Sequence, residues 1–131
     1  MPKKFCRIYV AGKLSPVGDK AHPAIEYLGN IKNLIRASLD VWFAGYTPFC
    51  PALDYQFWFH LNEGEFITEA MVKRYSKDWL EVCDAVMLTP GWRQSKGTLA
   101  EIKRAEKLKI PVFESLGELQ KNDTQGEEDD K

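Results

Sequence analysis

The stretch AVMLTPGWRQSKGTLAEIKRA, residues 85–105, decides the fold of this chain. Its first four residues are wholly apolar, which is typical of a strand buried on both faces of a parallel sheet. Thr89 to Gly97 contains proline and glycine and predicts a loop. From Thr98 to Lys109 the apolar residues recur with a helical period. A buried strand, a loop and a helix in this order form one unit of an α/β fold.

Similar units lie on both sides of this stretch. Apolar, β-branched runs predict further strands over residues 5–10, 46–50 and 110–113. Helical spacing predicts helices over residues 30–44, with Asn30 as N-cap and Gly45 just past the end, and over 66–82. Residues 52–64 are aromatic-rich and predict a loop or short helix, and residues 115–119 a last helical turn. We therefore expect a flavodoxin-like or Rossmann-like three-layer fold with a parallel sheet of four to five strands.

Length and composition limit the possible functions. The 131 residues are enough for one domain, which we expect over residues 1–120, and the polar, acidic residues 121–131 predict a disordered tail. A net charge of −1 argues against binding to a nucleic acid polymer, although it leaves room for a small phosphate pocket. The three cysteines form no C-x-x-C pair, so we expect a cytoplasmic protein without a metal site. No apolar run is long enough to span a membrane.

The ligand crevice of such a sheet lies beyond the carboxyl ends of its strands. This rule brings together the segments 9–12, 50–54 and 89–97 with the start of the third helix. Glu101 is the first candidate here, as a carboxylate kept ionised by the helix N-terminus, or else as the partner of Thr98 in a capping box. Asp78, near the end of the second helix, is either a second site carboxylate or a solvated acid. Tyr9 either orients a carboxylate or is a core residue.

Two loops supply further candidates. Ser95, Lys96 and Gly97 precede the third helix and suit an anion, or serve only as a turn and N-cap. Gly12 follows the first strand in a similar donor-rich loop. The aromatic residues of segment 55–59 and Trp92 are suited to stacking on a nucleobase or to burial in a subunit contact.

Several of these motifs together resemble the nucleoside 2-deoxyribosyltransferase superfamily, which includes the 2′-deoxynucleoside 5′-phosphate N-hydrolases. The likeness covers residues 5–119, and the motifs that carry it are Tyr9-Val10-Ala11-Gly12, Lys77-Asp78-Trp79-Leu80 followed by Cys83-Asp84-Ala85-Val86, and Gly91-Trp92 with Ser95-Lys96-Gly97-Thr98-x-x-Glu101. The closest likeness is to a small uncharacterised branch.

The resemblance implies roles for individual residues. Glu101 corresponds to the nucleophile, Asp78 to the assisting aspartate and Tyr9 to the tyrosine that positions the glutamate. Ser95 and Gly97 correspond to the loop that binds the sugar or its 5′-phosphate. Arg93 and Lys96 suit a 5′-phosphate too, or are solvated loop charges.

The implied reaction is cleavage of the N-glycosidic bond of a nucleoside or nucleoside 5′-monophosphate, by hydrolysis or base exchange and without a cofactor. Glutamate attack at C1′ with a second carboxyl group for the protons follows the logic of retaining glycosidases. The alternative is a non-catalytic module that binds a nucleotide derivative. Members of this superfamily complete their sites with a neighbouring subunit, so we expect a homo-oligomer.

Overall fold

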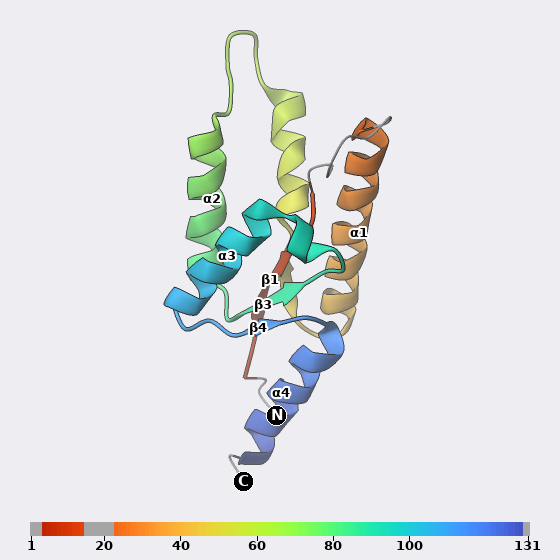
Figure 1. The fold of residues 1–131 in the computed structure, drawn as a ribbon, viewed down its shortest axis with the longest axis vertical. Coiled ribbons are helices and arrows are strands. Elements are labelled where there is room, and N and C mark those ends of the chain that lie inside the picture. Colours follow the sequence, from red (N-terminus) through yellow and green to blue (C-terminus); the bar gives the residue numbers. More distant parts are fainter. Residues whose placement is uncertain (1–3, 15–22, 130–131) are drawn as a thin grey trace.

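A central parallel sheet organises the computed structural model, which describes residues 4–14 and 23–129 (Figure 1). Its four strands are β1 (Arg7–Ala11), β2 (Thr47–Phe49), β3 (Ala85–Leu88) and β4 (Val112–Phe113). They run in the order β2-β1-β3-β4, and every neighbouring pair is parallel. This order is that of a flavodoxin-like sheet, and it confirms the predicted fold class.

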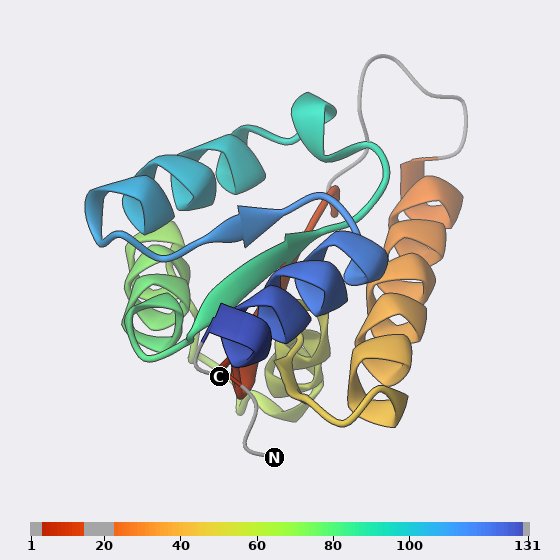
Figure 2. The same cartoon turned by 90° about the horizontal axis from the view of Figure 1, so that it is seen from below.

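Helices cover both faces of the sheet (Figure 2). One face packs against α1 (Pro23–Phe43) and α4 (Leu116–Asp129), and the other against α2 (Glu69–Glu81) and α3 (Lys96–Lys107). Alternate residues of β1 divide between the two cores: Ile8 and Val10 face α1, whereas Tyr9 and Ala11 face α2 and α3. The apolar strands are therefore buried on both sides, as a parallel sheet requires.

Helix α1 begins earlier than predicted. Pro23 opens it, because a proline suits the first turn of a helix, where its missing N–H is not needed. Asn30, the expected N-cap, is instead buried inside the helix and donates from Nδ2 to the carbonyl of Leu14 at 2.9 Å. The predicted end is correct, since Gly45 follows the helix with a left-handed φ of 98°.

Helix α3 also begins earlier than predicted, at Lys96. Its N-cap is Ser95, whose Oγ accepts the N–H of Thr98 at 3.1 Å. Thr98 is therefore inside the first turn and donates its hydroxyl to the carbonyl of Gly12 at 3.0 Å. A capping box between Thr98 and Glu101 is wrong, because Glu101 lies in the second turn, beyond the amides that need a cap.

The C-terminal segment differs from the expected disordered tail, because α4 continues to Asp129. Asp123 explains the start of this extension: its buried carboxylate accepts the N–H of Phe5 at 3.1 Å and the hydroxyl of Tyr46 at 2.9 Å. These bonds tie α4 to the N-terminal end of the chain and to the residue before β2. Residues 130–131 lie outside the described part.

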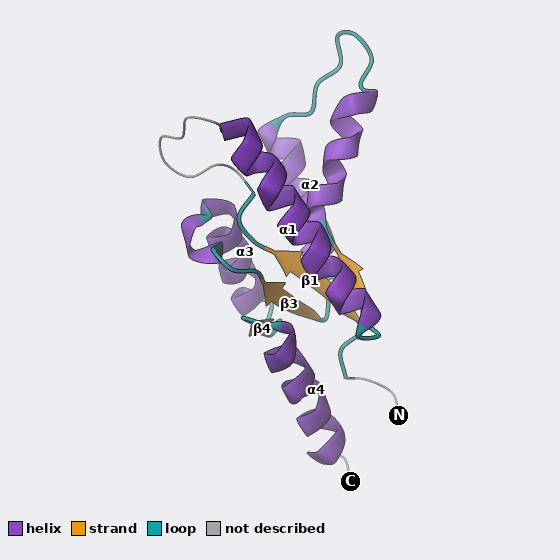
Figure 3. Ribbon diagram, turned by 90° about the vertical axis from the view of Figure 1, so that its right-hand side faces the viewer, coloured by secondary structure: helices purple, strands orange, loops and turns teal. Residues whose placement is uncertain are grey.

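A two-part arm rises beyond the carboxyl end of β1 (Figures 1 and 3). We define it as residues 51–81, which comprise the 3₁₀ helix η1 (Pro51–His60), a connecting loop and α2. The apolar side chains of α2 are only partly covered: Met71 and Trp79 are exposed, as is Val82 just after the helix. Leu80 is the residue of α2 that enters the core.

Candidate active site

Tyr9 and Glu101 meet on the face of the sheet that α2 and α3 cover. Tyr9 is fully buried in β1, and Glu101 reaches it from the second turn of α3. Tyr9 Oη and Glu101 Oε2 are both buried, and neither has a hydrogen bond of regular geometry within the described residues. They are nevertheless close enough that each shifts the pKa of the other. Buried polar atoms without a partner are uncommon and frequently mark a place where a ligand or water binds.

The electrostatics of this pair differ from the sequence-based expectation. Burial raises the pKa of the Glu101 carboxyl to about 7, and the Tyr9 hydroxyl lowers it by less. The expectation that the helix N-terminus keeps Glu101 ionised is therefore wrong. Burial has the larger effect, and it favours the protonated, neutral form of this carboxyl group. Burial, followed by the charge of Glu101, raises the pKa of Tyr9 well above its usual range. Tyr9 therefore remains a neutral hydroxyl group.

Asp78 is not brought to this pair. Its side chain is 64% exposed and lies 3.9 Å from the guanidinium of Arg74, one turn earlier on α2. The α2 residue that faces the Tyr9 hydroxyl is Ser76. Two residues further along a helix correspond to a rotation of about 200°, so Asp78 points to the opposite side.

A different carboxylate, Asp54, lies near Tyr9. Asp54 is partly buried in the first turn of η1, and its charge contributes to the raised pKa of Tyr9. Burial raises the pKa of Asp54 to about 6, while a hydrogen bond from the Tyr75 hydroxyl lowers it. The same contact, after burial, raises the pKa of Tyr75.

A cluster of aromatic rings lies beside Tyr9. Phe49 of β2 lies 5.4 Å from the ring of Tyr9 and is stacked on Trp79 at 5.1 Å. Tyr75 packs against Phe49 at 6.3 Å and meets the edge of Phe57 at 6.2 Å. Such a surface combines apolar area with hydroxyl groups, which suits a flat heterocyclic ligand.

Gly12 is required by packing at the carboxyl end of β1. A Cβ at this position would lie 1.7 Å from Thr89 Oγ1. The Gly12 carbonyl also accepts the Thr98 hydroxyl, which links the end of β1 to the start of α3. Gly12 therefore aligns the elements that carry Tyr9 and Glu101, and its role in substrate binding stays a prediction.

The loop before α3 places the remaining predicted residues. Ser95 caps the helix, and Lys96 and Gly97 are exposed in its first turn. Trp92 is partly buried against the core that contains Tyr9. Arg93 stacks over the Trp92 ring at 4.6 Å and pairs with Glu114 at 3.4 Å.

Asp54 and Ser76 are the residues that sequence reasoning did not single out. The rule that ligands bind beyond the carboxyl ends of parallel strands predicts that segment 50–54 lies near the crevice, and this segment includes Asp54. No sequence signal identifies Ser76, because its direction depends on how α2 is rotated against the sheet.

Within the described residues, no cluster of three or more His, Cys, Asp or Glu side chains is arranged to hold a metal ion.

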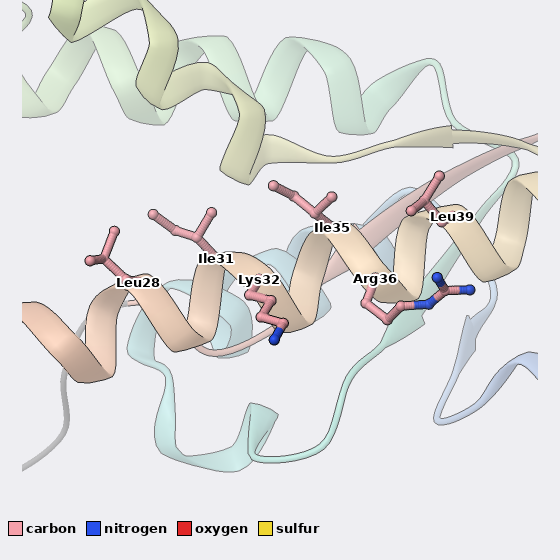
Figure 4. Close-up of a pocket in the computed structure, with 6 residues that line it drawn as sticks. All are labelled: Leu28, Ile31, Lys32, Ile35, Arg36 and Leu39. Atoms are coloured by element: carbon pink, nitrogen blue, oxygen red, sulfur yellow. The ribbon is translucent and has the colours of Figure 1, made fainter.

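A groove lies elsewhere, along one side of α1 (Figure 4). It is shallow, with a volume of about 390 Å³, and is lined by Leu28, Ile31, Lys32, Ile35, Arg36 and Leu39. This helix covers the opposite face of the sheet from Tyr9 and Glu101, so the groove is not part of the candidate active site.

Among the described residues, no helix is both long and apolar enough to cross a membrane.

Comparison with known protein families identifies the family of this chain. The model of a family described as a domain of unknown function, DUF4406, matches residues 6–114. The chain belongs to the DUF4406 family. No curated protein matches this DUF4406 domain.

The DUF4406 domain has a solved structural relative. It is similar to the 2-deoxyribosyltransferase from the psychrotolerant bacterium Bacillus psychrosaccharolyticus, with a TM-score of 0.52 and 20% sequence identity over 82% of this chain and 71% of that chain. A likeness at this identity establishes the fold. The predicted resemblance to the nucleoside 2-deoxyribosyltransferase superfamily is thereby confirmed at the level of the fold.

Proposed function

We propose that this DUF4406 domain cleaves the N-glycosidic bond of a nucleoside or nucleoside 5′-monophosphate, with Glu101 as the nucleophile. The observation that carries the proposal is the buried contact between Glu101 and Tyr9, two polar groups that lack regular hydrogen-bond partners within the described residues. The fold shared with a 2-deoxyribosyltransferase supports the class of substrate.

The chemistry follows from the surroundings of Glu101. Breaking the bond between C1′ and the base leaves positive charge on the sugar, which a buried carboxylate stabilises strongly because little water screens it. That charge also favours the ionised form of Glu101 during the reaction. Glu101 then bonds to C1′ while the base departs with the bonding electrons. Tyr9 holds the carboxyl group in position as a neutral neighbour.

Completion of the reaction depends on what enters next. Water attacking C1′ gives hydrolysis, and a second base gives base exchange. The resemblance assigns proton handling to Asp78, and an Asp78→Asn variant tests that assignment.

The loop before α3 is the proposed region for the sugar or its phosphate. Backbone N–H groups at the N-terminus of a twelve-residue helix attract anions, and Lys96 adds a positive charge in the first turn. Ser95, Gly97, Trp92 and Arg93 complete this set of predicted ligand-binding residues.

A direct assay tests the function. The purified protein is incubated with a panel of nucleosides and 5′-monophosphates, and release of free base is followed by mass spectrometry. Base release by the wild type and its loss in Glu101→Gln are expected, together with a sugar adduct on Glu101 in the wild type. Thermal stabilisation by a ligand without any product would instead indicate the non-catalytic binding module.

We also propose that the domain assembles with copies of itself. Large apolar side chains are exposed on α1 and on the arm, among them Leu28, Phe43, Phe57, Phe59 and Phe66. Large apolar and aromatic side chains of this kind are common at subunit contacts.

A further inference from the structure

Asp54 and Glu101 lie on different elements, and both interact with Tyr9 of β1. β1 and β2 are adjacent and parallel, and Tyr9 is in register with Phe49, the last residue of β2. η1 begins at Pro51, so Asp54 in its first turn lies at the carboxyl end of β2. Glu101 reaches Tyr9 from α3. In the sheet, β3 is the neighbour of β1 on the side away from β2. The two carboxyl groups therefore approach Tyr9 from different elements.

Electrostatic interactions support this arrangement. The pKa of Tyr9 is raised mainly by burial, then by the charge of Glu101, and more weakly by the charge of Asp54. The hydroxyl of Tyr9 thus lies within electrostatic reach of both acids. After burial, the charge of Asp54 also raises the pKa of Tyr75 of α2, and the Tyr75 hydroxyl in turn lowers the pKa of Asp54.

We propose that Asp54 is the carboxyl group that moves protons in the reaction for which Glu101 is the nucleophile. This inference rests on the proposed function, and it replaces Asp78 in the role that the family resemblance assigned. Asp54 is partly buried and interacts with Tyr75, whose ring packs against those of Phe49 and Phe57, whereas Asp78 is exposed and paired with Arg74. A proton donor must lie where the base leaves, and a ring-lined wall is the surface that a departing base contacts.

The two steps balance as follows. Glu101 forms a bond to C1′, the bond from C1′ to the base nitrogen breaks, and the protonated Asp54 gives its proton to the base. Asp54 is then a carboxylate. Water next attacks C1′, the bond from C1′ to Glu101 breaks, and Asp54 takes one proton from the water. The products are free base and sugar, and both acids return to their starting states.

A leaving group that needs no proton tests Asp54 specifically. The base of 7-methyl-2′-deoxyguanosine is already cationic, whereas that of 2′-deoxyguanosine requires protonation as it leaves. Asp54→Asn is expected to slow cleavage of 2′-deoxyguanosine by roughly 10²–10⁴-fold, the usual contribution of general acid catalysis, and cleavage of the methylated nucleoside by less than about tenfold. Both compounds are assayed with and without a 5′-phosphate. Asp40→Asn, which alters an exposed acid paired with Arg36 on α1, is the control expected to change neither rate.

A second variant tests the role of Asp54 even where Asp54→Asn fails to fold. Tyr75→Phe removes the hydrogen bond that lowers the pKa of Asp54, so the limb of the pH profile that reports Asp54 should move to higher pH. A structural role alone would not move it.

The outcomes separate this inference from the proposed function. No base release by the wild type from any of these compounds overturns both. An active wild type with Asp54→Asn equally active, or equally impaired on both nucleosides, overturns the role of Asp54 alone. Leaving-group-selective loss in Asp78→Asn rather than Asp54→Asn also overturns it, in favour of Asp78.

Discussion

Glu101 and Tyr9 are 92 positions apart in the sequence, yet the carboxyl group of one and the hydroxyl group of the other share a buried environment between α3 and β1. Their contact depends on the alternation of side chains along β1, which turns Tyr9 toward α3. It also depends on the bond between Thr98 and Gly12, which fixes the start of α3 against the end of β1.

The first prediction concerns the pH dependence of base release. Glu101 must be ionised to attack C1′, and its pKa in the folded protein is about 7. The rate should therefore fall as the pH decreases through about 7. Tyr9→Phe removes a group that lowers this pKa, so the same limb should move to higher pH. Rate–pH profiles of the two proteins are the measurement, and identical profiles would contradict the role of Tyr9.

The second prediction concerns stability. Burial raises the pKa of Glu101 from 4.5 to about 7, so the folded state holds more protons than the unfolded state between these values. The contribution of Glu101 to stability is present below pH 4.5 and is lost as the pH rises through about 7. Glu101→Gln should therefore be more stable than wild type at pH 8, by on the order of 2 kcal/mol, and the gain should shrink toward pH 4.5. Urea unfolding at several pH values measures this difference, and a constant difference would refute the assignment.

The third prediction concerns Gly12. A Cβ there would lie 1.7 Å from Thr89 Oγ1 in the packed interior, so Gly12→Ala should destabilise the fold by roughly 1–3 kcal/mol. Gly29 is the matched control, because it lies inside α1 with open space around its Cβ position. Gly29→Ala should be neutral or stabilising by up to about 1 kcal/mol. Equal effects of the two variants in thermal unfolding would show that Gly12 is not tightly packed.

The fourth prediction concerns Asp123. Removing its carboxylate takes away the acceptor of the Tyr46 hydroxyl and of the buried Phe5 N–H. Asp123→Ala should therefore lower the free energy of unfolding by roughly 1–3 kcal/mol. Tyr46→Phe removes the hydroxyl donor and should cost less, because Asp123 keeps its bond to Phe5. Chemical denaturation of both variants checks the order, and an unchanged Asp123→Ala would indicate that α4 is not held by this residue.

The fifth prediction concerns assembly. The exposed apolar side of α1 should pack against a second copy, so the sedimentation coefficient should rise with protein concentration. Leu28→Glu should weaken this association, because it places a charge among apolar side chains. Phe66→Glu, a change in the arm, tests whether that surface contributes as well. A single monomeric species at every concentration would contradict the prediction.

The local sequence determined much of this architecture. The apolar run Ala85–Leu88 and the alternation of strands with helices predicted a parallel α/β sheet, and the rule about carboxyl ends placed Tyr9, segment 50–54 and the start of α3 together. These inferences succeed because strand burial and right-handed connections follow from hydrophobicity and chain chirality, which are local properties.

The tertiary structure decided which side chains meet. The starts of α1 and α3 depend on contacts with distant residues, namely Asn30 with Leu14 and Thr98 with Gly12. The rotation of α2 turns Ser76 toward Tyr9 and Asp78 toward solvent, a choice that depends on packing against the sheet. The near-neutral pKa of Glu101 likewise comes from burial beneath elements far away in the chain, so sequence spacing alone could not predict it.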